Sequence, residues 1–298
     1  LIELVVITFA IRLDPGFHVL ILQVIWAIGG SMILLGILVW LPLPLIGIIG
    51  AVIFFGHNIF DLVKVSAVND TLPGKLLLSG HRGDYWPLDS NYSLAIAYSL
   101  LPWTGVMILG YVTGQLYQKS FDAVKRRKIL LNCGLSLFAL FLVFRYFNLY
   151  GDPSPWSVQK TTALSIISFF NVTKYPCSLL YLGMTLGLAL MILSVAEKMS
   201  NKFTKILIIY GNVPFFYYVC HWYLIKLINI IIFFISGYTS SQIVSPNPRI
   251  KAFQPEGFGF NLLGVYVVWL FVIVALYLPC RWYFNYKRTH RQWLLSYL

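Results

Sequence analysis

At least seven apolar stretches in this chain approach the length that a helix needs to cross a lipid bilayer, which is about 20 residues. They lie near 18–41, 43–63, 92–117, 129–147, 176–197, 205–235 and 260–283. Charged residues make up 11% of the chain, against about 25% in soluble domains. Backbone polar groups in lipid must be paired internally, and the short alternating strands of a barrel are missing. We therefore predict an all-α, polytopic transmembrane helix bundle.

The chain enters directly into an apolar run, Leu1 to Ile11, without the charged leader of a signal peptide. We expect this run to be the end of an earlier transmembrane helix in a protein whose upstream part is missing. The expected organisation is a single integral membrane domain over 1–298, with about seven full spans and a truncated first one. The stretch at 205–235 is long for one span, and Gly211 and Pro214 could divide it into a short piece and a full helix.

The formal net charge is +12, which in a soluble protein would suggest a nucleic-acid partner. Here we expect no nucleic acid, because basic loops between apolar spans orient a membrane protein with its positive side in the cytoplasm. By helix counting, one face holds most of the basic residues, and the carboxy terminus is then cytoplasmic. These residues are Lys119, Lys125, Arg126, Arg127, Lys128, Lys198, Lys202, Lys205, Arg281, Lys287, Arg288 and Arg291.

Ionisable and amide side chains within apolar spans are costly, so each is a candidate site residue. His57, Asn58 and Asp61 close the stretch at 43–63. His57 and Asp61 are four residues apart and would share one helix face. They are candidates for a general-base pair or a substrate clamp, and a polar helix end at the lipid headgroups explains them equally well.

A second group lies in the stretch at 92–117, where Pro102 is expected to bend a helix and Trp103 could line a cavity. Gly105 and Gly110 would allow a neighbouring helix to approach closely. The alternative is a kinked helix that serves packing alone.

A third group precedes the stretch at 176–197 and contains Asn171, Lys174, Tyr175 and Ser178. A helix start beside a lysine attracts anions, including a developing oxyanion. The alternative is an interfacial lysine next to a helix cap.

The fourth group is Asn212, Tyr218 and His221, inside the stretch at 205–235. A histidine within a span and flanked by phenols could serve as a proton relay, a base or a gate. A buried histidine that is merely hydrogen-bonded is the other interpretation. No metal site is predicted, because HExxH is missing and cysteine and histidine do not cluster.

Taken together, five strings resemble one family. They are GHNIFD from Gly56, LPWTGVMILGY from Leu101, FNLYGDP from Phe147, NVTKYPCSLLYLGMTLG from Asn171 and YGNVPFFYYVCHWYLIK from Tyr210. Together they resemble bacterial membrane proteins related to the catalytic domain of heparan-α-glucosaminide N-acetyltransferase. The likeness extends from about Gln23 to Leu227. Lys174, Ser178, Leu179 and Tyr181 match one pattern of the animal enzymes, and Asn212, Phe216, Tyr218 and His221 match another, with a different spacing before Asn212.

The resemblance implies a membrane acyltransferase that takes acetyl from acetyl-CoA in the cytoplasm and passes it to an amino sugar or glycan of the cell envelope. It also implies a bacterial inner membrane and a principal catalytic histidine upstream of this chain. His221, Asn212 and Lys174 are then the catalytic candidates. The substrate-binding candidates are His57, Asn58, Asp61, Trp103, Asn171, Tyr175, Ser178 and Tyr218. Direct transfer and transfer through an acylated histidine are both open.

Two further classes of protein fit the same residues. A transporter or flippase for a small molecule or glycolipid would use the intramembrane histidine and lysine as proton or substrate sites, although such proteins often show an inverted repeat that is not evident here. A non-catalytic subunit is the third class. The expected partners are the lipid bilayer and the sugar or glycan acceptor. A homodimer is also compatible with the sequence.

Overall fold

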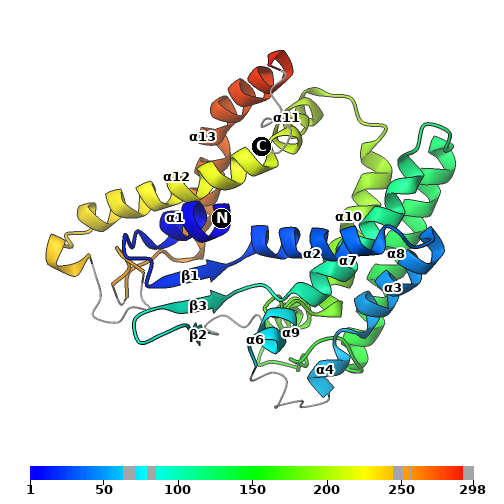
Figure 1. The fold of residues 1–298 in the computed structure, drawn as a ribbon, viewed down its shortest axis with the longest axis horizontal. Coiled ribbons are helices and arrows are strands. Elements are labelled where there is room, and N and C mark those ends of the chain that lie inside the picture. The colour runs from blue at the N-terminus through cyan, green and yellow to red at the C-terminus, as the bar shows by residue number, and fades with distance from the viewer. Residues whose placement is uncertain (63–70, 79–84, 244–250, 256, 291–298) are drawn as a thin grey trace. The chain divides into compact units, whose positions relative to one another are not determined.

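The computed structural model describes residues 1–62, 71–78, 85–243, 251–255 and 257–290, and the part of the chain that it describes is mostly helical (Figure 1). Helices account for 69% of it and strands for 4%. Among the described residues, five helical segments are long and apolar enough to cross a membrane: Leu43–Asp61, Ala123–Phe147, Leu179–Ala196, Pro214–Ile235 and Leu262–Thr289. These segments suggest an integral membrane protein, in agreement with the predicted class.

Two of the predicted spans are shorter as helices than the sequence suggests, because each begins with a short strand. Strand β1 (Val19–Leu22) precedes helix α2 (Val24–Leu38), and strand β3 (Ser93–Ile96) precedes helix α7 (Leu100–Thr113). At 1.5 Å per residue, helices of 15 and 14 residues are about 22 Å long, less than the roughly 30 Å of a bilayer core. The prediction of about seven full spans is therefore not confirmed.

The strands form a three-stranded sheet in the order β1-β3-β2, where β2 is Tyr85–Pro87. The Ser93 amide donates to the His18 carbonyl at 2.9 Å, and the Ala97 amide donates to the Leu22 carbonyl at 2.9 Å. The sheet was not predicted, because a four-residue apolar strand next to an apolar helix has the same composition as a longer helix.

The chain separates into two compact units, and each is described by itself. The prediction of a single domain stays a prediction. Unit 1 comprises Leu1–Ile21, Leu88–Ser93 and Met199–Leu298, and unit 2 comprises Leu22–Pro87 and Leu94–Lys198. Short helical elements beside the main helices are η1 (Glu3–Ile7), α4 (Ile59–Leu62), α6 (Leu72–Leu77), η2 (Gly114–Tyr117), α9 (Thr162–Phe170) and η3 (Ser240–Gln242).

Unit 2 packs its helices in pairs through small residues. Helix α3 (Leu43–Gly56) lies against α7, and α8 (Ala123–Phe147) lies against α10 (Leu179–Ala196). A β-carbon on Gly105 would lie 3.0 Å from the backbone nitrogen of Phe54, so the predicted close approach is confirmed there. It is wrong at Gly110, whose β-carbon position meets open space.

Pro102 does not have the predicted effect of bending a long helix. Helix α7 begins at Leu100, which places Pro102 in its first turn. Amide groups of the first turn have no partner within the helix, so a proline there costs no hydrogen bond. Thr104 of α7 instead joins α2 through a contact of 3.1 Å between its hydroxyl and that of Ser31.

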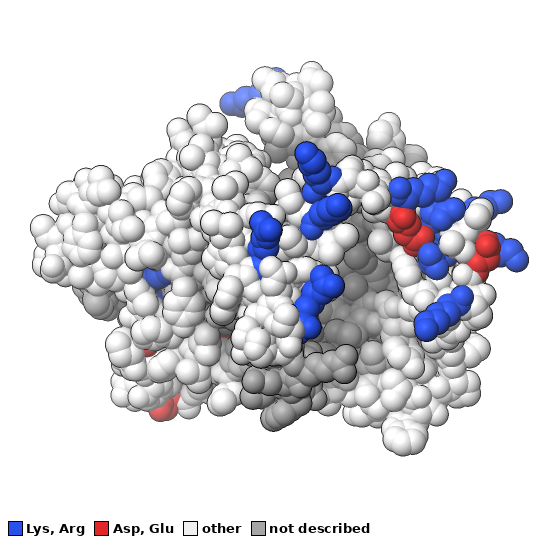
Figure 2. Space-filling model, turned by 90° about the horizontal axis from the view of Figure 1, so that it is seen from above, with Lys and Arg blue, Asp and Glu red and all other residues white. Residues whose placement is uncertain are grey.

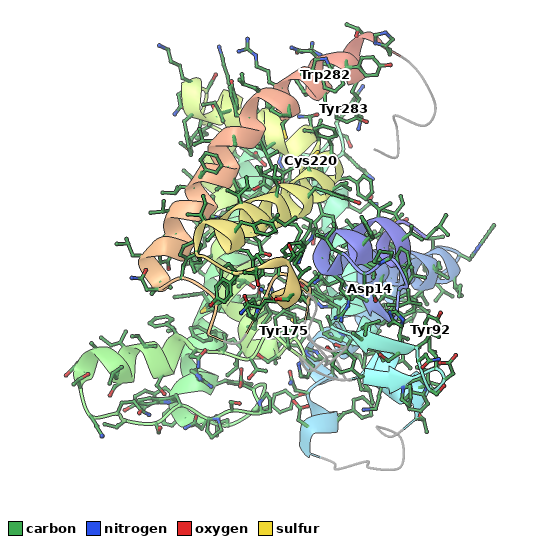
Figure 3. All side chains as sticks on the ribbon, turned by 90° about the vertical axis from the view of Figure 1, so that its left-hand side faces the viewer. Asp14, Tyr92, Tyr175, Cys220, Trp282 and Tyr283 are labelled. Carbon is green, nitrogen blue, oxygen red and sulfur yellow. The ribbon has the colours of Figure 1, made fainter. Side chains whose placement is uncertain are left out.

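Unit 1 contains α1 (Thr8–Arg12), α11 (Lys202–Asn212), α12 (Pro214–Ile235) and α13 (Leu262–Thr289). The predicted division of the stretch at 205–235 is confirmed, because α11 ends at Asn212 and α12 begins at Pro214. Val213 at this junction packs in a core with Val272, Leu276, Cys280 and Tyr283 of α13. Figure 3 labels Tyr283, whose ring stacks on Phe216 of α12 at 4.4 Å.

We predict that Gly134→Ala destabilises the α8–α10 pair. A β-carbon on Gly134 would lie 2.8 Å from the Gly187 carbonyl oxygen and 2.9 Å from the Met191 amide nitrogen, so backbone must move. The expected loss is about 1–3 kcal/mol of unfolding free energy. Unfolding of the full chain in mixed micelles, followed by circular dichroism, would measure it. Gly110→Ala is the matched control, since helical alanine there meets nothing; equal stability of the two variants would contradict the prediction.

Candidate functional site

Asp152 organises the segment that leads into helix α10. Its carboxylate accepts hydrogen bonds from the Thr173 amide at 2.7 Å, from the Thr173 hydroxyl at 2.9 Å and from the Ser178 hydroxyl at 2.9 Å. Ser178 in turn caps α10, because its hydroxyl oxygen accepts from the Tyr181 amide at 3.0 Å. The segment carrying Lys174 is thereby fixed at both ends by one carboxylate.

Arg145, in the last turn of α8, secures the other side of this segment. Its side chain is 2% exposed, and its nearest guanidinium nitrogen lies 3.9 Å from the Asp152 carboxylate. The guanidinium donates to four backbone carbonyls at 2.6–3.0 Å, those of Ser154, Ser168, Phe169 and Asn171. Neither Arg145 nor this role of Asp152 was predicted, although an arginine inside an apolar helix is by itself a signal of a special site.

His57 and Asn58 reach the same segment from the end of α3. The Leu179 amide donates to the Asn58 side-chain oxygen at 2.7 Å, and His57 Nε2 lies 3.1 Å from the Cys177 carbonyl oxygen. The other ring nitrogen of His57 lies 2.9 Å from the Phe54 carbonyl oxygen. The Asp61 carboxylate accepts from the side-chain nitrogen of Asn58 at 2.6 Å. The two ring nitrogens of His57 thus face backbone carbonyls, and the side chain that hydrogen-bonds to Asp61 is that of Asn58.

A cavity of about 280 Å³ in unit 2 lies beside this fixed segment. Its walls come from α2, α7, the start of α10 and the segment before α10. The lining residues are Val24, Ala27, Ile28, Ser31, Tyr98, Trp103, Val106, Met107, Lys174 and Tyr181. Two residues singled out from the sequence, Trp103 and Lys174, therefore line one cavity.

Aromatic rings and one lysine give this cavity its chemistry. Tyr98 lies between Trp103 and Tyr175, with ring centroids 5.6 Å and 5.5 Å away. The Lys174 ammonium nitrogen is 5.3 Å from the centroid of the Tyr175 ring, and it also interacts with the Tyr181 phenol. Figure 3 labels Tyr175. The arrangement offers two strong hydrogen-bond donors, an ammonium and a phenol, at the edge of an apolar pocket.

Such an arrangement can hold an apolar or sugar-like body against aromatic faces and stabilise negative charge on an oxygen atom. It does not supply a thiolate nucleophile, because burial raises the pKa of the nearby Cys177 thiol. Asn171 contributes through its backbone carbonyl to Arg145, while its side chain is exposed.

The remaining predicted residues belong to unit 1. His221 of α12 stacks on Tyr217, with ring centroids 5.6 Å apart and planes 4° apart, and its Nδ1 contacts the Tyr218 carbonyl oxygen. The Tyr218 ring lies 5.4 Å from that of His221. Asn212 ends α11, is exposed and donates to the Ile208 carbonyl at 2.8 Å. The predicted residues thus fall into two groups, one in each unit.

Within the described ranges, no group of three or more His, Cys, Asp and Glu side chains could hold a metal ion. Comparisons with protein-family models, curated proteins and solved structures found no match to this chain. The chemistry of the two groups is therefore argued from their geometry.

We predict that Arg145→Met destabilises the full chain by about 3–5 kcal/mol, because it leaves Asp152 charged and buried without its cation. Arg145→Lys should recover little of this loss, since one ammonium cannot serve four carbonyls as a guanidinium fork does. Denaturation in mixed micelles would measure both. Lys128→Met is the matched control, as Lys128 is an exposed cation on the same helix; a loss as large as that of Arg145→Met would refute the special role of Arg145.

Proposed function

We propose that this chain is an integral membrane acyltransferase that moves an acetyl group from acetyl-CoA to the amino group of an envelope sugar or glycan. The observation that carries the proposal is the cavity of unit 2, in which Lys174 and Tyr181 meet a wall of aromatic rings. The resemblance of the five sequence strings to membrane N-acetyltransferases points to the same reaction.

Lys174 and Tyr181 would act on the acyl carbonyl. Attack on this carbonyl places negative charge on its oxygen. An ammonium and a phenol at the edge of an apolar cavity stabilise that charge more than water would. Their surroundings hold them in place before the reaction, because the segment before α10 is bonded to Asp152 and Arg145. Trp103, Tyr98 and Tyr175 would bind the apolar face of a sugar ring.

The transfer step balances without another reactant. The acceptor nitrogen forms a bond to the acyl carbon, and the bond from that carbon to its carrier breaks. The carrier atom is the sulfur of CoA in direct transfer or a ring nitrogen of an acylated histidine in the two-step route. The proton lost by the acceptor nitrogen ends on the released carrier.

The charge distribution of unit 2 supports an acceptor site on the outward side. Arg126 at the start of α8 forms an ion pair of 2.8 Å with Glu197 at the end of α10, so these two helix ends lie together. This end is rich in basic side chains, as the right of Figure 2 shows. Its cations are Lys125, Arg126, Arg127, Lys128 and Lys198. The cavity residue Lys174 lies shortly before the first residue of α10, at the other end of this helix. Helix α10 has 18 residues and is about 27 Å long.

By the positive-inside rule the basic end would be cytoplasmic, and the carboxy terminus with it. Lys125 to Lys128 could then meet the phosphates of CoA, while the cavity receives the acceptor from outside. The membrane would be a bacterial inner membrane, as the resemblance implies.

His221 and Asn212 are the candidates of unit 1. A histidine that stacks on Tyr217 keeps one ring nitrogen available for a proton, because its Nδ1 is engaged by the Tyr218 carbonyl. Tyr218 would position this ring, through its carbonyl and its own ring.

We predict that Lys174→Met lowers acetyl transfer by at least about 100-fold, the lower range for loss of one oxyanion donor. The assay supplies radiolabelled acetyl-CoA on the cytoplasmic side of sealed vesicles and follows label into amino sugars on the other side. Lys160→Met is the control, because Lys160 is an exposed lysine of the same unit.

Label on the sugar that depends on the protein and on Lys174 would support the proposal. Label retained on the protein would indicate the two-step route. Protein-dependent passage of the sugar itself without labelling would instead identify a transporter or flippase and contradict acyl transfer.

Orientation is tested separately with two single cysteines at exposed positions, Lys160→Cys and Lys198→Cys. We expect a membrane-impermeant thiol reagent to label Lys160→Cys in intact cells and Lys198→Cys only after permeabilisation. The unsubstituted chain measures labelling of the four native cysteines. The reverse pattern would place the basic end outside and exclude cytoplasmic CoA binding there.

A further inference from the structure

Unit 1 contains a second cavity that none of the functions above uses. It has a volume of about 100 Å³ and lies among α1, α12 and the segment 251–255. The described residues that line it are Ala10, Ile11, Trp222, Ile225, Lys226, Asn229, Lys251 and Gln254. It therefore opens beside a helix that is long and apolar enough to cross a membrane.

Lys226 is the central charge of this cavity. The residue is 8% exposed, and its ammonium donates to the Ala252 carbonyl at 2.6 Å. The same nitrogen lies 5.8 Å from the ring centroid of Phe253. An ammonium has three donors, and a lysine in an apolar span is retained when it has a partner or a task. The bond to Ala252 holds the segment 251–255 against α12 and uses one of these donors.

Two polar atoms on the same wall lack a hydrogen-bond partner in the part of the chain that the structure describes. They are the indole nitrogen of Trp222 and the side-chain oxygen of Asn229, and both are buried. Trp222 lies four residues before Lys226 and Asn229 lies three after it, so all three share one face of α12. A buried polar atom without a partner is costly, and a bound ligand that pairs with it would remove this cost.

The electrostatic field of the cavity favours an anion. Lys251 contributes a second cation to the lining, and both Lys251 and Arg12 lie close enough to Lys226 to interact with its charge. The lining residues within the described ranges include no acidic side chain. Donors from Trp222 and two lysines then surround a space in which an acceptor oxygen with negative charge would be stabilised.

We propose that this cavity binds the phosphate group of a hydroxyl-bearing phosphate ester. The indole of Trp222 and the ammonium groups of Lys226 and Lys251 would donate to phosphate oxygens, and the Asn229 oxygen would accept from the hydroxyl. This chemistry is shared by the glycerol phosphate headgroup of an anionic lipid and by free glycerol phosphate. A volume of about 100 Å³ accommodates a phosphate group.

The test uses the full chain, purified in a neutral detergent and titrated with dihexanoyl phosphatidylglycerol or with glycerol 3-phosphate. Binding is followed by isothermal calorimetry. Trp222→Phe keeps the ring and removes the N–H donor, and we expect it to weaken binding about tenfold or more, as for loss of a hydrogen bond to a charged group. Trp269→Phe is the matched control, because Trp269 is 55% exposed on α13 and outside the cavity.

Asn229→Leu provides a second variant that removes the acceptor while leaving the Lys226–Ala252 bond intact, and thermal unfolding checks that both variants fold. Binding of the lipid alone identifies a lipid headgroup site, and binding of both ligands identifies a site for phosphate esters in general. Binding of neither ligand, or equal affinity of Trp222→Phe and the unsubstituted chain, would overturn the proposal.

Discussion

The candidate site of unit 2 depends on the buried contact between Arg145 and Asp152. The segment between α8 and α10 is largely irregular, and its buried backbone polar groups need partners within the protein. Arg145 pairs four carbonyls of this segment, and Asp152 pairs two amides and two hydroxyls. Each charge also offsets the other, at 3.9 Å. The position of Lys174 follows from this one arrangement.

The same arrangement explains why residues with catalytic side chains serve structure here. Asn58 accepts from the first amide of α10, and His57 bonds to the carbonyl of Cys177, which precedes that helix. Helix starts have amides without internal partners, and polar side chains from a neighbouring helix satisfy them where water is excluded. His57 and Asn58 therefore support the site, while Lys174 and Trp103 line its cavity.

Prediction from the sequence succeeds for features that depend on local chemistry. It does not succeed for contacts between residues that are distant in the chain. The helix break before Pro214 was predictable, because proline lacks an amide donor and fits the first turn of a new helix. The shortening of the two spans was not predictable, because strands β1 and β3 are as apolar as the helices they precede. Lys174, Trp103 and His57 were each predicted as candidates, but the bond between His57 and Cys177 joins residues 120 positions apart. No rule of sequence spacing relates residues so far apart in the chain. Arg145 is not distinguished by its sequence position, because basic residues near helix ends usually determine membrane topology.

The two cavities differ in a way that bears on their ligands. In unit 2 the supporting polar atoms are already paired with one another, so the cavity presents aromatic faces and two donors to a ligand that brings little charge of its own. In unit 1 the polar atoms of Trp222 and Asn229 are unpaired beside Lys226, so the cavity is incomplete without an acceptor and a donor from outside the described chain. Under the two proposals, an amino sugar occupies the first cavity and an anionic ester the second.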